Sequence, residues 1–208
     1  GRSELSELLA FARQRGLWII ADEIYALFHY TGGRAASFMD VMEAEDRIIF
    51  VNSFSKNWAM TGWRIGWLTV HPSLGSVIEN LIQYSTSGVA QFMQKAAVAA
   101  LDQGDAFIRM QVDRASKARN IVCEKLLATG KVELSPPEGA FYLYFKVSSV
   151  NDSMQAAFSM VDNAKVGIAP GSAFASDDSG WFRVCFNRSL DEMEDGASRI
   201  AAWVNRFA

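Results

Sequence analysis

Short apolar segments that stop abruptly at polar residues constrain the fold of this chain more than any other feature. Residues 17–21 read L-W-I-I-A and stop at Asp22, and residues 47–51 read R-I-I-F-V and stop before the polar pair N-S. A short apolar run between polar residues is typical of a strand that is buried on both faces of a sheet. Helical periodicity over residues 3–15, just before the first run, therefore predicts an α/β fold.

The rest of the chain predicts a second, smaller part. A third strand is expected over residues 64–70, and a hinge rich in proline and glycine follows at residues 135–139. The hinge separates the first part from a smaller α+β unit. The remaining expected elements are helices at residues 74–83, 91–101, 106–128, 153–163 and 190–207, and strands at residues 140–147, 166–169 and 181–187.

Composition and charge exclude several classes of function. The 208 residues carry a formal net charge of −3 with no basic stripe, so no nucleic-acid partner is expected. The longest apolar runs are too short to span a membrane. The two cysteines, Cys123 and Cys185, are predicted to be reduced, buried thiols. Since there are only two histidines as well, no metal site is expected.

A lysine and an arginine follow the second apolar run, where ligand-binding groups of an open α/β sheet gather. Ser53 stands at the end of this run, and Lys56 and Arg64 follow it. A serine hydroxyl and a guanidinium suit a phosphate, while a lysine amine can form a Schiff base with an aldehyde. Asp22 could keep a heteroaromatic nitrogen protonated, and the Tyr25 hydroxyl could reach an oxygen on the same ring. Together these requirements describe pyridoxal phosphate.

Each of these residues also has a simpler structural interpretation. Asp22 could be a strand-end or capping carboxylate, Tyr25 a buried tyrosine, and Arg64 a salt-bridge arginine. Ser55 could touch the phosphate or only shape the turn. Glu23 is expected to point away from Asp22, because neighbouring side chains on a strand alternate, and it is interpreted as structural.

Five motifs, in one order, resemble those of a known enzyme family. The run S-F-S-K-N-W-A-M-T-G-W-R-I-G-W is similar to the lysine signature of class I/II aminotransferases, which are pyridoxal-phosphate enzymes of fold type I. A-D-E-I-Y precedes it, and P-E-G-A-F-Y-L-Y-F, V-G-I-A-P-G-S-A-F and W-F-R-V-C-F-N follow. The resemblance implies that Lys56 forms the Schiff base and that Arg183 binds the substrate α-carboxylate. It also implies amino-acid and 2-oxo-acid substrates, a homodimer and, as an expectation, a cytoplasmic location.

The resemblance covers only the C-terminal half of such enzymes. It implies a partial large cofactor-binding domain with a mostly parallel sheet over residues 1–105, an interdomain helix over residues 106–130, and a small α+β domain over residues 131–208. Three alternatives stay open: another fold type I enzyme such as a decarboxylase or lyase, a non-catalytic sensor domain, and a fragment inactive by itself. No residue indicates which amino acid is the donor.

Overall fold

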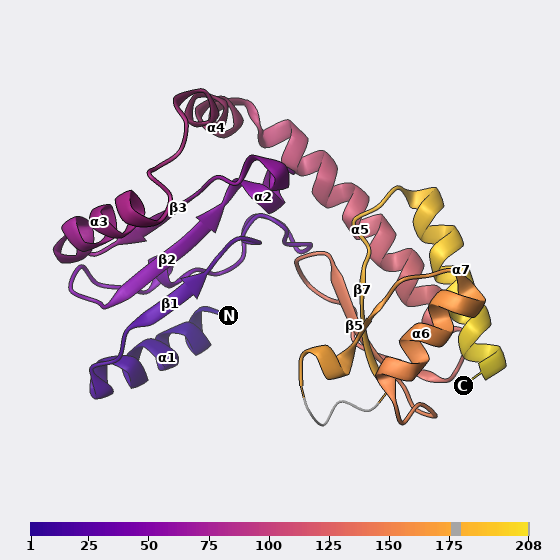
Figure 1. Ribbon diagram of the computed structural model, residues 1–208. Coiled ribbons are helices and arrows are strands. Elements are labelled where there is room, and N and C mark those ends of the chain that lie inside the picture. Colours follow the sequence, from indigo (N-terminus) through magenta and orange to yellow (C-terminus); the bar gives the residue numbers. More distant parts are fainter. Residues whose placement is uncertain (176–179, 208) are drawn as a thin grey trace. The chain divides into compact units, whose positions relative to one another are not determined.

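The computed structural model describes residues 1–175 and 180–207, and the chain divides into two compact units (Figure 1). Unit 1 is Gly1–Met110 and unit 2 is Gln111–Ala208. The long helix α5 (Asp105–Leu127) crosses the boundary between them.

Unit 1 contains one three-stranded sheet in the order β1-β2-β3. Strands β1 and β2 are parallel, whereas β2 and β3 are antiparallel. The expectation of a mostly parallel sheet is therefore wrong for the strands described. The physical reason is local: the N–H of Phe54 donates to the Ile65 carbonyl (3.2 Å), so β3 starts beside the end of β2. The elements are α1 (Arg2–Arg15), β1 (Ile19–Asp22), β2 (Ile48–Ser53), α2 (Phe54–Asn57), β3 (Gly66–Val70), α3 (Gly75–Ser85) and α4 (Gln91–Gln103), with 3₁₀ turns at Phe38–Asp40, Thr61–Trp63 and Pro72–Leu74.

One face of this sheet packs against α1, and the opposite face carries exposed apolar side chains. Leu9 of α1 forms a core cluster with Ala21, Ile48 and Phe50, which alternation places on one face. Ile20 and Leu68 point to the opposite face and are 70% and 42% exposed. The expectation that residues 17–21 form a strand buried on both faces is therefore wrong, because within residues 1–175 and 180–207 no element covers Ile20.

We call this opposite side the open face. Strand register places on it the side chains of Ile20, Asp22, Ile49, Val51, Ser53, Leu68 and Val70.

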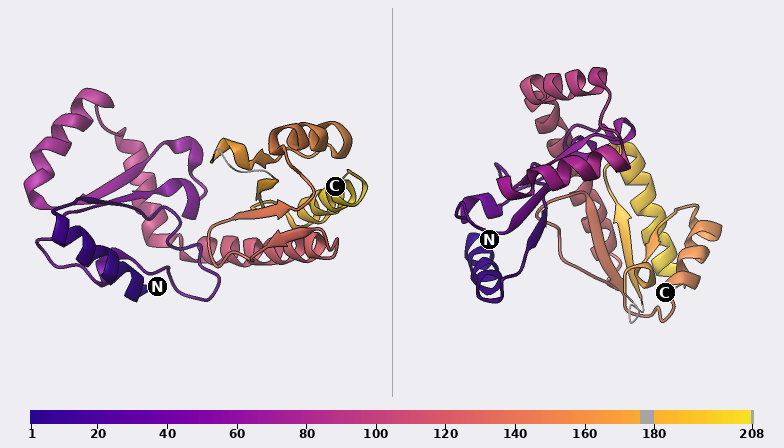
Figure 2. Two further views of the ribbon diagram at one scale, coloured as in Figure 1. Left: turned by 90° about the horizontal axis from the view of Figure 1, so that it is seen from below. Right: turned by 60° about the vertical axis from the view of Figure 1, so that its left-hand side comes forward.

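Unit 2 is an antiparallel sheet in the order β4-β5-β7-β6. Its inward side chains are almost fully buried, as Leu143, Phe145 and Phe182 show. Helices α6 and α7 lie side by side in this unit (Figure 2). The strand expected at residues 166–169 is wrong over residues 166–168, because β6 covers only Ala169–Pro170, and β4 is not among the predicted elements. The elements are β4 (Val132–Leu134), β5 (Tyr142–Val147), α6 (Ser153–Ala164), β6 (Ala169–Pro170), β7 (Trp181–Cys185) and α7 (Leu190–Phe207), with a 3₁₀ turn at Gly171–Ala173.

The two cysteines differ in burial. Cys123 is buried on α5, but Cys185 is exposed. The prediction of two buried thiols is therefore wrong for Cys185. Alternation along β7 and the residue after it turns Val184 and Phe186 into the core, so Cys185 points outward.

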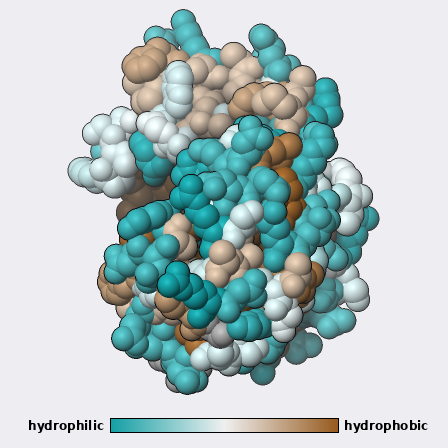
Figure 3. Space-filling model, turned by 90° about the vertical axis from the view of Figure 1, so that its right-hand side faces the viewer, coloured by the Kyte–Doolittle hydropathy of each residue, from teal (hydrophilic) through white to brown (hydrophobic). Residues whose placement is uncertain are grey.

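The surface over α6 and α7 is dominated by hydrophilic residues, with hydrophobic ones scattered among them (Figure 3). None of the helices that the structure describes combines the length and the apolar character needed to cross a membrane. Over the same described ranges, no group of three or more His, Cys, Asp or Glu residues could hold a metal ion.

Candidate active site

The turn from β2 into α2 fixes the position of Lys56. Ser53 caps this short helix, because its Oγ accepts a hydrogen bond from the backbone N–H of Ser55 (3.0 Å). The Ser53 hydroxyl also donates to the Ile65 carbonyl oxygen (3.4 Å). Lys56, half-buried, therefore sits on a short helix whose first residue is fixed at the carboxyl end of β2.

The loop after Lys56 is held in a strained conformation. Ala59 and Arg64 have φ angles of 53° and 52°, a left-handed region that costs a non-glycine residue roughly 1–2 kcal/mol. The Arg64 Nη1 donates to the Thr61 carbonyl oxygen (3.0 Å), and its other N–H groups donate to no residue that the structure describes. Backbone strain of this kind gathers at functional sites, where surrounding contacts enforce it.

Lys56 lies near a residue from the turn that follows the neighbouring strand. Its Nζ lies 5.9 Å from the centroid of the Tyr25 ring. Tyr25 belongs to the turn that follows β1, in which Ala26 N–H donates to the Glu23 carbonyl (3.0 Å). The structure thus brings together the ends of β1 and β2, as expected for parallel neighbours.

Asp22 and Glu23 at the end of β1 point to opposite sides. Asp22 lies on the open face with Ser53, and its Oδ1 accepts a hydrogen bond from the Ile24 backbone N–H (3.2 Å). Glu23 accepts from the Ser37 hydroxyl at 2.7 and 2.9 Å and from the Phe38 N–H at 3.3 Å. Glu23 therefore anchors a loop, which confirms its structural interpretation. The Asp22 side chain points to the open face.

Arg183 lies in unit 2 on β7, half-buried between two aromatic rings. Its Cζ is 4.5 Å from the centroid of the Tyr142 ring and 4.3 Å from that of Phe174. No carboxylate in the described part of the chain forms an ion pair with it. The guanidinium is therefore held by π faces, and a carboxylate ligand would find it without a competing ion pair.

Sequence reasoning missed three residues at these places. Asn57, next to Lys56, is 3% exposed, and its Oδ1 accepts no hydrogen bond from the described residues. Strand alternation could have placed Tyr142 on the same face as Arg183. Phe174 ends the motif V-G-I-A-P-G-S-A-F, but nothing in that motif shows that its ring reaches Arg183 from the turn after β6.

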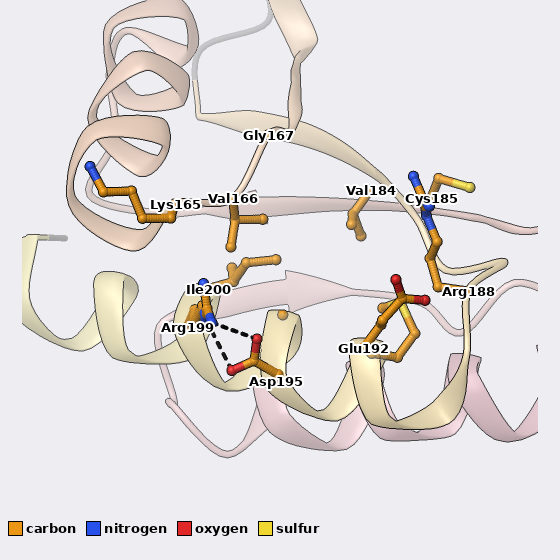
Figure 4. Close-up of a pocket in the computed structure, with 12 residues that line it drawn as sticks. Lys165, Val166, Gly167, Val184, Cys185, Arg188, Glu192, Asp195, Arg199 and Ile200 are labelled. Carbon is orange, nitrogen blue, oxygen red and sulfur yellow. Dashed lines mark hydrogen bonds and ion pairs between the residues drawn. The ribbon is translucent and has the colours of Figure 1, made fainter.

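A separate pocket of about 360 Å³ lies in unit 2 beside α7 (Figure 4). None of the predicted site residues lines it. Two of its charges neutralise each other, because Arg199 and Asp195 form an ion pair at 2.7 Å. The lining residues are Lys165, Val166, Gly167, Val184, Cys185, Arg188, Glu192, Met193, Asp195, Gly196, Arg199 and Ile200.

Comparison with known proteins gives a consistent result. The model of the family described as aminotransferase class I and II matches residues 1–200. The chain is 34% identical over 204 residues to an aspartate aminotransferase of Thermotoga maritima, a match that covers 98% of this chain and 52% of that protein.

Solved structures agree in fold. The crystal structure of an aspartate aminotransferase from Thermotoga maritima superposes with a TM-score of 0.88 at 33% identity, covering 98% of this chain and 52% of that one. An aromatic aminotransferase from Pyrococcus horikoshii superposes with a TM-score of 0.89 at 27% identity, and the match covers 97% of this chain and 55% of that one. The chain has an α/β fold of this kind and spans about half the length of the curated relatives it matches.

Proposed function

The chain belongs to the aminotransferase class I and II family, and we propose that it carries the cofactor lysine and substrate arginine of a pyridoxal-phosphate-dependent aminotransferase. The observation that carries the proposal is the position of Lys56 just before a strained loop, 5.9 Å from the ring of Tyr25 at the adjoining strand end. The relatives are about twice as long as this chain, so the proposal concerns the steps that its own residues perform.

The residues present fit pyridoxal phosphate. Arg64 retains unused donors, and the hydroxyls of Ser53 and Ser55 lie on the same turn, which suits a phosphate group.

When bound, pyridoxal phosphate supplies an electron sink for the carbanion formed at the substrate Cα. Lys56 would hold the group covalently, and its freed Nζ would take the Cα proton as a general base and then donate that proton, as a general acid, at an atom other than Cα. Asp22 would keep the ring nitrogen protonated, and the hydrogen bond from Ile24 N–H orients its carboxylate. The Tyr25 hydroxyl would donate to the ring oxygen.

Arg183 would bind the substrate α-carboxylate through paired N–H donors and orient the Cα–H bond. The substrates in this proposal are an L-amino acid and a 2-oxo acid. We propose further a homodimer in the cytoplasm, with residues 1–105 as the partial cofactor-binding domain, residues 106–130 as the interdomain helix and residues 131–208 as the small domain.

Covalent labelling tests the role of Lys56. The chain is incubated with pyridoxal phosphate, reduced with borohydride and mapped by peptide mass spectrometry. One adduct on Lys56 is expected, and Lys56→Ala removes it. Lys95→Ala is the matched control, because Lys95 is an exposed lysine of α4 in the same unit and its loss leaves the adduct unchanged. Adducts spread over surface lysines with none preferred would contradict the proposal.

A second assay separates amino transfer from the other reactions of this cofactor. Aspartate and phenylalanine are offered as amino donors with 2-oxoglutarate as acceptor, since the similar proteins are named aspartate and aromatic aminotransferases. Glutamate formation that depends on Lys56 and Arg183 supports the proposal. Release of carbon dioxide without glutamate would favour a decarboxylase.

A further inference from the structure

The outer face of the unit 2 sheet carries a continuous set of aromatic rings around Arg183. Tyr144 lies directly opposite Arg183 in the β5–β7 register, and Tyr142 is its diagonal neighbour. Tyr144 stacks on Trp181 with ring centroids 4.8 Å apart, and it forms a T-shaped pair with Phe174, with ring centroids 6.4 Å apart. The inward residues of the same strands are core, so alternation alone separates this aromatic face from the core.

Two of these rings enclose the guanidinium. Arg183 Cζ lies within cation–π distance of both Tyr142 and Phe174, at 4.5 and 4.3 Å. The rings come from different elements, since Tyr142 starts β5 and Phe174 follows the 3₁₀ turn Gly171–Ala173. That turn is closed by the Phe174 N–H, which donates to the Gly171 carbonyl at 2.7 Å. Phe174 is thus fixed by its backbone as well as by Tyr144.

This arrangement differs from an ordinary arginine anchor. An arginine held by a carboxylate has its charge neutralised and its paired N–H donors occupied. Rings hold the planar guanidinium through its faces and leave the donors at its edge for a ligand. Rings contact the faces of the Arg183 guanidinium, and no described carboxylate forms an ion pair with it. Arg183 therefore differs from an arginine anchored by an acidic side chain.

We propose that Tyr142 and Phe174 are positioning residues that preorganise Arg183 for the carboxylate of the substrate, an inference that rests on the function proposed above for Arg183. Removing either ring leaves the arginine mobile. A carboxylate ligand must then order the side chain on binding. We expect Phe174→Leu and Tyr142→Leu each to weaken carboxylate binding about 3- to 10-fold, as the loss of one cation–π contact implies.

Nuclear magnetic resonance on the full chain tests this directly. The Nε–H resonance of Arg183, assigned by its loss in Arg183→Lys, reports the ring currents of the enclosing aromatics. Titration with succinate, a simple dicarboxylate, reports affinity at the same atom. Both leucine variants should move the resonance and weaken succinate binding. Tyr142→Phe keeps the ring and should preserve both, and Phe158→Leu, at an exposed phenylalanine of α6, is the matched control.

Each outcome is decisive. An Arg183 resonance that neither leucine variant moves would show that the rings do not hold the guanidinium. A moved resonance with unchanged succinate affinity would overturn the positioning role and leave the proposed function intact. Arg183→Lys binding succinate as tightly as the wild type would instead overturn the carboxylate role of Arg183, and the positioning inference with it. Tyr142→Phe also guards against misfolding, because it retains the packing that Tyr142→Leu removes.

Discussion

The ammonium nitrogen of Lys56 and the ring of Tyr25 lie 5.9 Å apart, although the two residues follow different strands of the unit 1 sheet. This distance is within the range of a weak cation–π contact. It ties the proposed cofactor lysine to a residue that also carries a hydroxyl, so the ring and the hydroxyl of Tyr25 can be tested separately.

Tyr25→Phe should weaken pyridoxal phosphate binding about 3- to 10-fold, because one hydrogen bond of about 1 kcal/mol is lost. Tyr25→Leu should weaken it further, since the contact with Lys56 is removed as well. Absorbance titration of the chain with the cofactor measures both. Tyr84→Phe, at a tyrosine 89% exposed, is the control and should bind normally. A Tyr25→Leu protein that binds the cofactor as tightly as the wild type would refute the role of this residue.

Gly66→Ala should disturb the site through the backbone. An added Cβ would lie 2.5 Å from the Asn52 carbonyl oxygen, and Gly66 pairs with Ser53. We expect the free energy of unfolding to fall by about 1–3 kcal/mol, as for other overpacked positions. Urea denaturation measures it, and Lys56 labelling should fall in parallel. At Gly62 a Cβ meets no heavy atom within 4 Å, so Gly62→Ala should stay within about 0.5 kcal/mol. Equal effects at the two glycines would contradict the argument.

Stability should fall in acid through the ion pair of Arg34 and Asp40. The hydrogen bond from Arg34, and next that from the Ser37 N–H, lower the pKa of Asp40 from its ordinary value of 3.8 to about 2. A depressed pKa in the folded state stabilises the protein above the unfolded value and loses this contribution as the pH falls through the folded one. The contribution is therefore present above pH 3.8 and lost toward pH 2.

Urea midpoints of the wild type and Asp40→Asn between pH 2 and pH 6 test this window. The difference between the two proteins should shrink as the pH approaches 2. Asp162→Asn, at an exposed carboxylate of α6, is the control for the loss of one negative charge. A difference that stays constant over the whole window would rule out Asp40 as the titrating group.

The two thiols should react at very different rates. Cys185 is exposed, whereas burial raises the pKa of the Cys123 thiol above its ordinary value. Because the thiolate is the nucleophile, a disulfide reagent such as 5,5′-dithiobis(2-nitrobenzoate) should modify Cys185 rapidly in the folded chain and Cys123 only after unfolding. Cys185→Ser should abolish the fast phase and Cys123→Ser should keep it. Two fast thiols in the folded wild type would contradict the observed burial.

Local pattern was sufficient to predict much of this protein. Apolar runs and helical periodicity placed α1, β1, β2, α5 and α7 within a few residues of their observed bounds. The motif around Lys56 identified the family before any fold was known, and the family comparison agrees over residues 1–200. Helices, strands and short motifs can be predicted from the sequence because each depends on residues close together in the chain.

Contacts between distant segments decided the rest. The direction of β3 depends on the hydrogen bond between Phe54 and Ile65. The exposure of Ile20 depends on which face of the sheet α1 covers. Cys185 points outward because β7 packs Val184 into the core, and Arg183 lies between rings from two other segments. The sequence of an apolar strand does not show whether one or both of its faces are covered, because the covering element lies elsewhere in the sequence. The sequence by itself determined the elements and the chemistry of their ends, and only the tertiary structure decided which side chains those ends bring together.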